Sequence, residues 1–234
     1  MSTGILGDTI DIHGGGADLE FPHHTNEIAQ SEAKTGKTFA NYWMHNGFVN
    51  IDNVKMSKSL GNFITVHDAL KTIDGQVLRF FFATQHYRKP INFTEKAVRD
   101  AETNLKYLKN TYEQPFTGEV DPAELQGFVD KFIAAMDEDI NAANGITVVF
   151  ELAKWINSGH YNQDVKDALT KMLEVFGVVF VEEVLDADIE ALIAERQEAR
   201  ANKDFARADA IRDELAAQGI KLLDTKEGVR WTRD

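Results

Sequence analysis

The chain has 234 residues, a formal net charge of −13 and no cysteine, so disulfides are excluded and a cytosolic location is favoured. Its length allows one or two hydrophobic cores, and its 43% apolar content is ordinary for a soluble globular protein. No apolar run reaches the roughly 20 residues of a membrane helix, and residues 1–11 lack the features of a secretory signal. The acidic charge argues against non-specific coating of nucleic acid, although a local basic patch can still bind folded RNA.

The N-terminal segment predicts a βαβ unit. Residues 5–12 alternate and are rich in β-branched side chains, which favours a strand, and residues 13–18 form a glycine-rich turn. Pro22 suits the first turn of a helix, and Gly36 is placed to end that helix. A second strand is expected over residues 42–51. This order implies a parallel sheet, and one such unit is too small for a complete doubly wound domain.

The sequence after Thr65 predicts mostly helices. Residues 77–82 are almost wholly apolar and predict a buried helix, whereas Thr94 and Asp121 are placed to cap the N-termini of two longer ones. We expect further helices over residues 145–156 and 165–176, so that this region forms an antiparallel bundle. The remainder predicts a charged tail module, with helices over 188–200 and 202–218 and a β-hairpin over 220–225 and 229–233.

The segment Lys55-Met56-Ser57-Lys58-Ser59 is the most informative motif. It follows the second predicted strand and an Asp52-Asn53 turn. Two ammonium groups on a short loop at a strand end can stabilise charge that develops on phosphoryl oxygens. The alternative is a solvated surface turn. The segment resembles the KMSKS loop of class I aminoacyl-tRNA synthetases at every position.

Two other patterns upstream could carry chemistry. The glycines at 14–16 would let a flat ligand approach the backbone, and the Asp18 carboxylate could accept hydrogen bonds from ribose hydroxyls. The alternative is a tight turn capped by Asp18. His23 and Glu27 are spaced i, i+4 and could bind one zinc ion, but two ligands do not make a site. Their alternative role is a pairing of carboxylate and imidazole at a helix N-terminus.

Several of these segments together resemble cysteinyl-tRNA synthetases, and the likeness continues through the helices to Trp231. The matching segments are 11–19, 21–24, 26–30, 42–45 and 55–62. In that family a zinc ion binds the thiolate of the substrate cysteine, held by two cysteines, a histidine and a glutamate. The resemblance implies that His23 and Glu27 are the latter two ligands. Thr25 stands where the family usually has glutamate, at a position that is not a ligand.

The resemblance also assigns roles to individual residues. It implies that Lys55 and Lys58 are catalytic, and that His13 and His24 contact the substrate. The implied ATP-binding residues are Gly15, Gly16, Asp18, Lys55, Met56, Ser57, Lys58 and Ser59. For tRNA we expect Arg230, Trp231 and Arg233, because a ring between arginines suits unstacked bases and phosphates. Alternatively, Trp231 covers a small core.

The fold class implied is α/β followed by mostly α. Residues 1–64 would be the C-terminal half of a Rossmann-type catalytic domain, 65–93 a connecting helical segment, 94–183 a tRNA-binding helical bundle, and 184–234 a small α+β anticodon-recognition module. Family members begin with a first Rossmann half that carries the HIGH motif and one zinc cysteine. Their second zinc cysteine falls just ahead of Met1. We therefore expect a C-terminal portion with an incomplete zinc site that is inactive alone.

The function implied is that of a cysteine–tRNA ligase, with zinc as cofactor and with cysteine, ATP–Mg and tRNA(Cys) as substrates. We expect a cytoplasmic monomer without membrane contact. Two alternatives stay open. One is a non-catalytic tRNA-binding or interaction fragment. The other, less favoured, is a paralogue that ligates cysteine to an amino sugar, because such relatives lack the tail that residues 188–233 provide.

Overall fold

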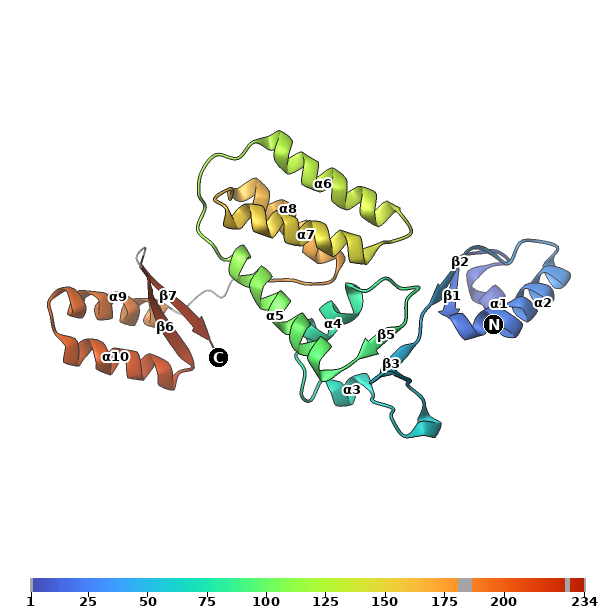
Figure 1. The fold of residues 1–234 in the computed structure, drawn as a ribbon, viewed down its shortest axis with the longest axis horizontal. Helices are drawn as coiled ribbons and strands as arrows, with labels where there is room; N and C mark the ends of the chain where they lie inside the picture. Colours follow the sequence, from blue (N-terminus) through green and yellow to red (C-terminus); the bar gives the residue numbers. More distant parts are fainter. Residues whose placement is uncertain (1, 181–186, 226–227, 234) are drawn as a thin grey trace. The chain divides into compact units, whose positions relative to one another are not determined.

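The computed structural model describes residues 2–180, 187–225 and 228–233 (Figure 1). The chain divides into two compact units, Met1–Phe180 and Val181–Asp234. Within the described residues, no helix is both long and apolar enough to cross a membrane.

The first unit contains three groups of elements. The N-terminal group is α1 (Ser2–Leu6), β1 (Ile10–Gly16), the short turns η1 (Ala17–Leu19) and η2 (Glu20–His24), α2 (Thr25–Thr35) and β2 (Ala40–Asn46). The middle group is β3 (Val49–Ile51), β4 (Val54–Lys55), η3 (Lys58–Leu60), α3 (Val66–Ala69), α4 (Gly75–Ala83) and β5 (Ile91–Phe93). The bundle group is α5 (Glu95–Tyr112), α6 (Pro122–Asp137), α7 (Ala142–Asn157) and α8 (Gln163–Val175).

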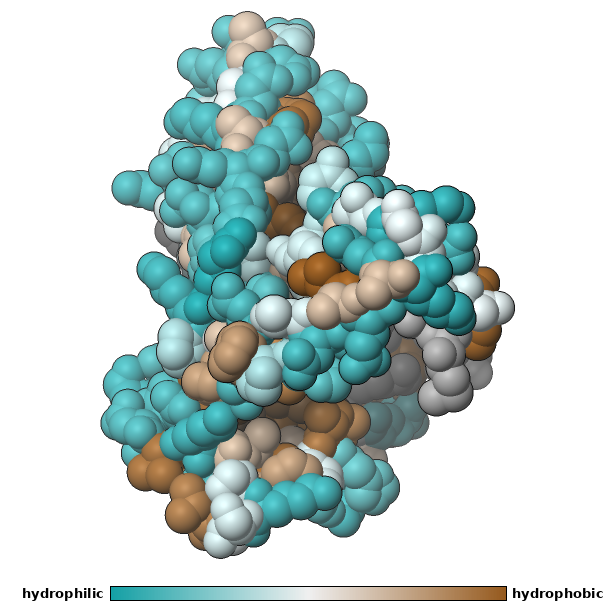
Figure 2. Space-filling model, turned by 90° about the vertical axis from the view of Figure 1, so that its right-hand side faces the viewer, coloured by the Kyte–Doolittle hydropathy of each residue, from teal (hydrophilic) through white to brown (hydrophobic). Residues whose placement is uncertain are grey.

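The predicted βαβ unit is confirmed. Strands β1 and β2 pair in parallel with α2 between them, and α2 ends at Gly36, whose φ of 66° is in the left-handed region. Ile10, Phe39 and Ala40 form a small core beneath this sheet, with Ile28 and Trp43 packed against it. Other apolar side chains here are exposed, namely Ile12 on β1 and Tyr42 on β2, which oppose each other in the register. Figure 2 views the molecule from this side and shows apolar patches among the hydrophilic surface.

The bounds of both predicted strands were wrong. Residues 5 and 6 belong to α1, and β1 starts only at Ile10, because pairing with β2 begins there. The predicted glycine turn is strand as far as Gly16, and the chain turns only from Ala17. The predicted strand over 42–51 is two strands separated at Gly47. A Cβ on Gly47 would overlap the carbonyl group of Lys89, so a crossing segment interrupts the strand at this glycine.

The second sheet has the order β4-β3-β5. Strands β3 and β4 form a two-residue hairpin in which Ile51 pairs with Val54. Its central residues, Asp52 and Asn53, have φ values of 49° and 66°, as a type I′ turn requires. This confirms the turn predicted before the lysine-bearing segment, and it fixes where that segment starts.

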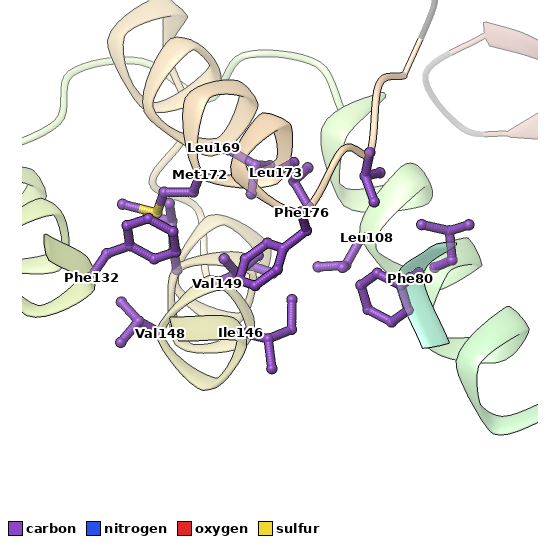
Figure 3. Close-up of a cluster of buried hydrophobic side chains, with 14 of the residues drawn as sticks. Phe80, Leu108, Phe132, Ile146, Val148, Val149, Leu169, Met172, Leu173 and Phe176 are labelled. Carbon is purple, nitrogen blue, oxygen red and sulfur yellow. The ribbon is translucent and has the colours of Figure 1, made fainter. Parts of the chain in front are cut away.

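The buried residues of α4 to α8 form one continuous core (Figure 3). Phe80 comes from α4, Leu108 from α5, Phe132 from α6 and Val149 from α7. Capping is as predicted, because the Thr94 side chain accepts from the Ala97 N–H and the Asp121 side chain from the Ala123 N–H. The expectation of a helical bundle after a partial α/β start is confirmed.

The second unit contains α9 (Ala187–Ala201), α10 (Phe205–Ala217), β6 (Ile220–Thr225) and β7 (Gly228–Arg233). Strands β6 and β7 form the predicted antiparallel hairpin. Buried Ile189, Ile211, Leu215 and Ile220 form a core of its own, against which Leu222 packs. This core holds the two helices and β6 of the unit together.

Candidate active site

A cluster of imidazoles surrounds Glu27 on the first turn of α2. His13 projects from β1, and its Nε2 lies 2.8 Å from Glu27 Oε2. His24 lies at the end of η2, with its ring edge-on to that of His13 at 4.8 Å. One metal-ligating atom from each of these three residues lies within 4.8 Å of the others. The cluster thus joins a strand and a helix start into one polar site.

His24 is the buried member of this cluster, at 3% exposure. A Cβ on Gly15 would lie 2.9 Å from His24 Cε1, so this glycine makes room for the ring against β1. Nδ1 of His24 lies 2.8 Å from Nε2 of His45 on β2, so one imidazole donates a hydrogen bond to the other. Burial, with smaller contributions from His13 and His45, lowers the pKa of His24. A neutral imidazole results, which can donate at one nitrogen and accept or bind a metal at the other.

Glu27 is the residue of this cluster that is best suited to bind a metal ion. Its Oε2 is buried and, among the described residues, has no hydrogen-bond partner, since the close His13 contact lacks hydrogen-bond geometry. Its Oε1 lies 3.7 Å from Nε2 of His23, whose side chain is 61% exposed. Carboxylate and imidazole donors are suited to zinc. The structure thus brings together His23 and Glu27, the predicted metal ligands, and adds His13 to the same carboxylate.

The lysine loop, residues 55–62, is held by its own polar side chains. The Met56 N–H donates to the Val49 carbonyl at 3.0 Å, which fastens the loop start to β3. Asn62 Oδ1 accepts from the Ser57 N–H at 2.9 Å, and Asn62 Nδ2 donates to the Lys55 carbonyl at 3.3 Å. The Ser57 hydroxyl accepts from the Leu60 N–H and so caps η3. These bonds give the loop a defined shape while its lysines stay on the surface.

The two lysines of this loop differ in their neighbours. Lys55 Nζ lies 3.8 Å from the centre of the Phe48 ring and 3.5 Å from Asp18 Oδ2. Lys58 Nζ lies 5.6 Å from the centre of the Phe63 ring. The Lys55 and Asp18 side chains are each about half exposed. Residues predicted from two separate motifs therefore meet, and they place a carboxylate and an ammonium group side by side at the end of β1.

Two residues of the site, His45 and Asn62, were not predicted from the sequence. His45 reaches His24 only because β1 and β2 pair with Gly15 opposite His45, and no spacing along the chain gives that register. Asn62 closes the lysine loop through side-chain bonds to residues five and seven positions earlier. A polar residue at the last position of the loop, three residues before Thr65, was the available signal for Asn62.

The predicted tRNA-binding residues lie on β7. The structure describes the backbone of Arg230, Trp231 and Arg233, but their side chains lie outside its described part. Trp231 opposes Leu222 and Arg233 opposes Ile220, whereas Arg230 opposes Leu223. Because neighbours along a strand alternate between faces, Arg230 lies on the opposite face of the hairpin from Trp231 and Arg233.

Three family models match this chain in order. Residues 1–103 match the catalytic domain of class I (C) tRNA synthetases, 131–182 a DALR domain, and 182–231 the anticodon-binding domain of cysteinyl-tRNA ligase. A cysteine–tRNA ligase from Streptococcus pneumoniae serotype 4 is 87% identical over all 234 residues, and one from Streptococcus mutans serotype c is 82% identical. The chain belongs to the cysteinyl-tRNA synthetase family.

The chain corresponds to the C-terminal portion of a cysteinyl-tRNA synthetase. It spans 52% of the length of each of these two curated relatives. Its fold also resembles that of a LeuRS from Agrobacterium radiobacter K84, solved in a ternary complex with tRNA and LeuAMS, with a TM-score of 0.50 and 15% identity. That match covers 73% of this chain and 27% of the LeuRS chain. The likeness supports a partial Rossmann-like start followed by helices.

Proposed function

We propose that these residues carry the second half of the catalytic site and the tRNA-binding part of a cysteine–tRNA ligase. The observation that carries this proposal is the 3.5 Å approach of Lys55 Nζ to Asp18 Oδ2. It joins the segment proposed to hold adenosine to the loop proposed to hold pyrophosphate. In a family of ATP-dependent ligases, one nucleotide would bind across both segments. Such binding requires the two segments to lie close together, as this pair does.

The reaction has two steps. The cysteine carboxylate attacks the α-phosphorus of ATP, so a C–O–P bond forms and pyrophosphate leaves. A hydroxyl at the tRNA 3′ end then attacks the carbonyl carbon and displaces AMP. Lys55 and Lys58 would stabilise negative charge on the departing pyrophosphate, because ammonium groups at that place act on charge that grows in the transition state. Met56, Ser57 and Ser59 would support them as part of the same loop.

The nucleotide and the amino acid would occupy adjacent places. Gly15 and Gly16 expose backbone next to Asp18, and a Cβ on Gly16 would lie 2.7 Å from Asp18 Oδ1, so the glycine makes room for this carboxylate. Asp18 would accept hydrogen bonds from ribose hydroxyls. His13 and the neutral His24 would border the substrate cysteine, since both rings lie beside the Glu27 carboxylate.

His23 and Glu27 are the residues that would hold zinc. When bound, this ion supplies selectivity for a thiol over a hydroxyl by binding sulfur directly. Zinc sites use three or four protein ligands, so this pair, with His23 from η2 and Glu27 from α2, is half of the set that the resemblance implies. We therefore propose that these 234 residues alone neither retain zinc nor activate cysteine.

The tail supports tRNA as the acceptor. Residues 182–231 match an anticodon-binding domain, which the amino-sugar-ligating paralogues would not need. The chain alone would then be a tRNA-binding fragment, and the two descriptions differ only in whether the remaining part of the catalytic domain is present. Arg230, Trp231 and Arg233 are the proposed contacts.

A chimera tests this proposal. The matching 52% of the Streptococcus pneumoniae relative would be replaced by this chain, and cysteine-dependent ATP–pyrophosphate exchange would be measured for the chimera and for the chain alone. We expect robust exchange for the chimera and none for the chain. Exchange by the chain alone would show that its residues form a complete site. A folded chimera without exchange would remove the proposed catalytic role.

A further inference from the structure

The turn between α6 and α7 makes a polar contact with a segment far away in the sequence. Asp139 Oδ2 accepts from Arg88 Nε at 2.6 Å, and Oδ1 accepts from Arg88 Nη2 at 3.1 Å. The Tyr87 hydroxyl donates to the same Oδ1 at 2.7 Å. One carboxylate in the bundle thus binds two adjacent side chains of the segment between α4 and β5.

The backbone of the turn is unusual at this point. Asp139 and Ile140 have φ values of 57° and 52°, a left-handed conformation that is uncommon for aspartate and costly for a β-branched residue. The turn is followed directly by α7. The Asn141 side chain caps the N-terminus of this helix by accepting a hydrogen bond from the Asn144 N–H. Such a conformation persists only where the surroundings enforce it, and here it presents the carboxylate to Arg88.

The segment that contains Tyr87 and Arg88 is connected to the lysine loop by backbone hydrogen bonds. The carbonyl of Tyr87 accepts from the Gly47 N–H at 2.7 Å, at the point where the chain passes from β2 to β3. Two residues later, the Val49 carbonyl accepts from the Met56 N–H at the start of the loop. Each step is a direct hydrogen bond or a short stretch of backbone. The contact at Asp139 is therefore connected to the position of Lys55 and Lys58.

Side-chain packing does not fill the space between the two parts. A cavity of about 330 Å³ lies here, and its lining includes Met44, Gly47, Tyr87 and Ile140. A close-packed core would fix the separation by itself. With a cavity between them, the polar contact has a larger share in setting how the turn meets the segment at Gly47.

We infer that Asp139 is a positioning residue, which with Tyr87 and Arg88 forms a latch from the α6–α7 turn to the β2–β3 junction and so to the lysine loop. The catalytic meaning of this latch rests on the proposed function of the loop, but the latch itself does not. The Arg88 and Tyr87 hydrogen bonds hold the pKa of Asp139 at about 2. The carboxylate therefore stays charged, and the latch stays closed, across the whole neutral range.

Hydrogen–deuterium exchange on the intact chain tests this inference without substrates. Asp139→Asn keeps the shape and removes the charge, so the amides of Gly47 and Met56 should exchange about 2- to 5-fold faster, the scale expected for an exposed charge network. Asp100→Asn is the matched control, because it removes the exposed Lys96–Asp100 ion pair of α5. It should leave both amides unchanged. The exchanged pair Arg88→Asp with Asp139→Arg should restore slow exchange.

Two results would overturn the latch. Unchanged exchange at Gly47 and Met56 in Asp139→Asn would show that the contact holds nothing beyond the turn. Faster exchange of the buried Leu152 amide in α7 to the same extent would show general destabilisation instead of positioning. In the chimera, Asp139→Asn should lower kcat for pyrophosphate exchange and leave KM for cysteine unchanged. If the chimera is inactive, the proposed function fails. The hydrogen–deuterium exchange result still decides whether the latch exists.

Discussion

At the scale of single residues, Glu27 is the most constrained member of the site. Its two carboxylate oxygens face different imidazoles, His13 at 2.8 Å and His23 at 3.7 Å, and the nearer oxygen is buried. The i, i+4 spacing predicted only the His23 contact. A metal held by His23 and Glu27 and one held by His13, His24 and Glu27 are different sites, and their ligand counts differ.

Zinc content separates these two sites. Two protein ligands should hold zinc weakly, because ligand number sets affinity. We therefore predict that the chain alone loses zinc during dialysis against a mild chelator, whereas the chimera keeps one ion and its Glu27→Gln variant loses it. Atomic absorption measures all three. One zinc per chain after dialysis would show instead that His13, His24 and Glu27 suffice, and His13→Ala should then release it.

At the scale of elements, the sequence correctly predicted helix caps and a turn, because these features depend on residues that are close together in the chain. Thr94 and Asp121 cap helices as expected, and the Asp52-Asn53 turn forms the hairpin that leads into the lysine loop. Strand ends were predicted less well. Where β1 starts depends on its partner β2, and Gly47 divides a strand because another segment crosses it. Such contacts come from the tertiary fold, as does the His24–His45 pair.

The tail hairpin yields a prediction from its register. Trp231 lies on the face of Leu222, which packs against the small core, and Arg230 lies on the other face. Arg230→Ala should therefore weaken tRNA(Cys) binding and lower the slope of log affinity against log salt by about 1, with an unchanged thermal midpoint. If Trp231 instead covers this small core, Trp231→Ala should lower the midpoint.

The base-stacking role proposed for Trp231 makes a different prediction. If an unstacked base rests on the ring, Trp231→Ala should cost about 1–3 kcal/mol of binding while the midpoint stays constant. Calorimetry and filter binding on the same variants distinguish the two. A stable Trp231→Ala variant with weaker binding would contradict the role in the core and support stacking.

At the scale of the whole molecule, the chain joins one part of a catalytic domain to a helical bundle and a separate tail unit. The sequence predicted this order. Its residue pattern indicates a single βαβ unit, then capped helices, then a terminal hairpin. It could not predict that the bundle contacts the segment at Gly47 through Asp139, since the partners lie about 50 positions apart. The central claim concerns the lysine loop and its place opposite Asp18.

The rate of adenylate formation in the chimera with Lys58→Ala tests that claim most directly. Loss of an ammonium group that acts in the transition state should lower this rate by about 10²-fold or more and leave KM for cysteine nearly constant. Lys106→Ala, at an exposed lysine of α5, is the control and should change neither quantity. A large rise in KM for cysteine with an unchanged rate would contradict the account, because the loop would then bind the amino acid instead of acting on the pyrophosphate.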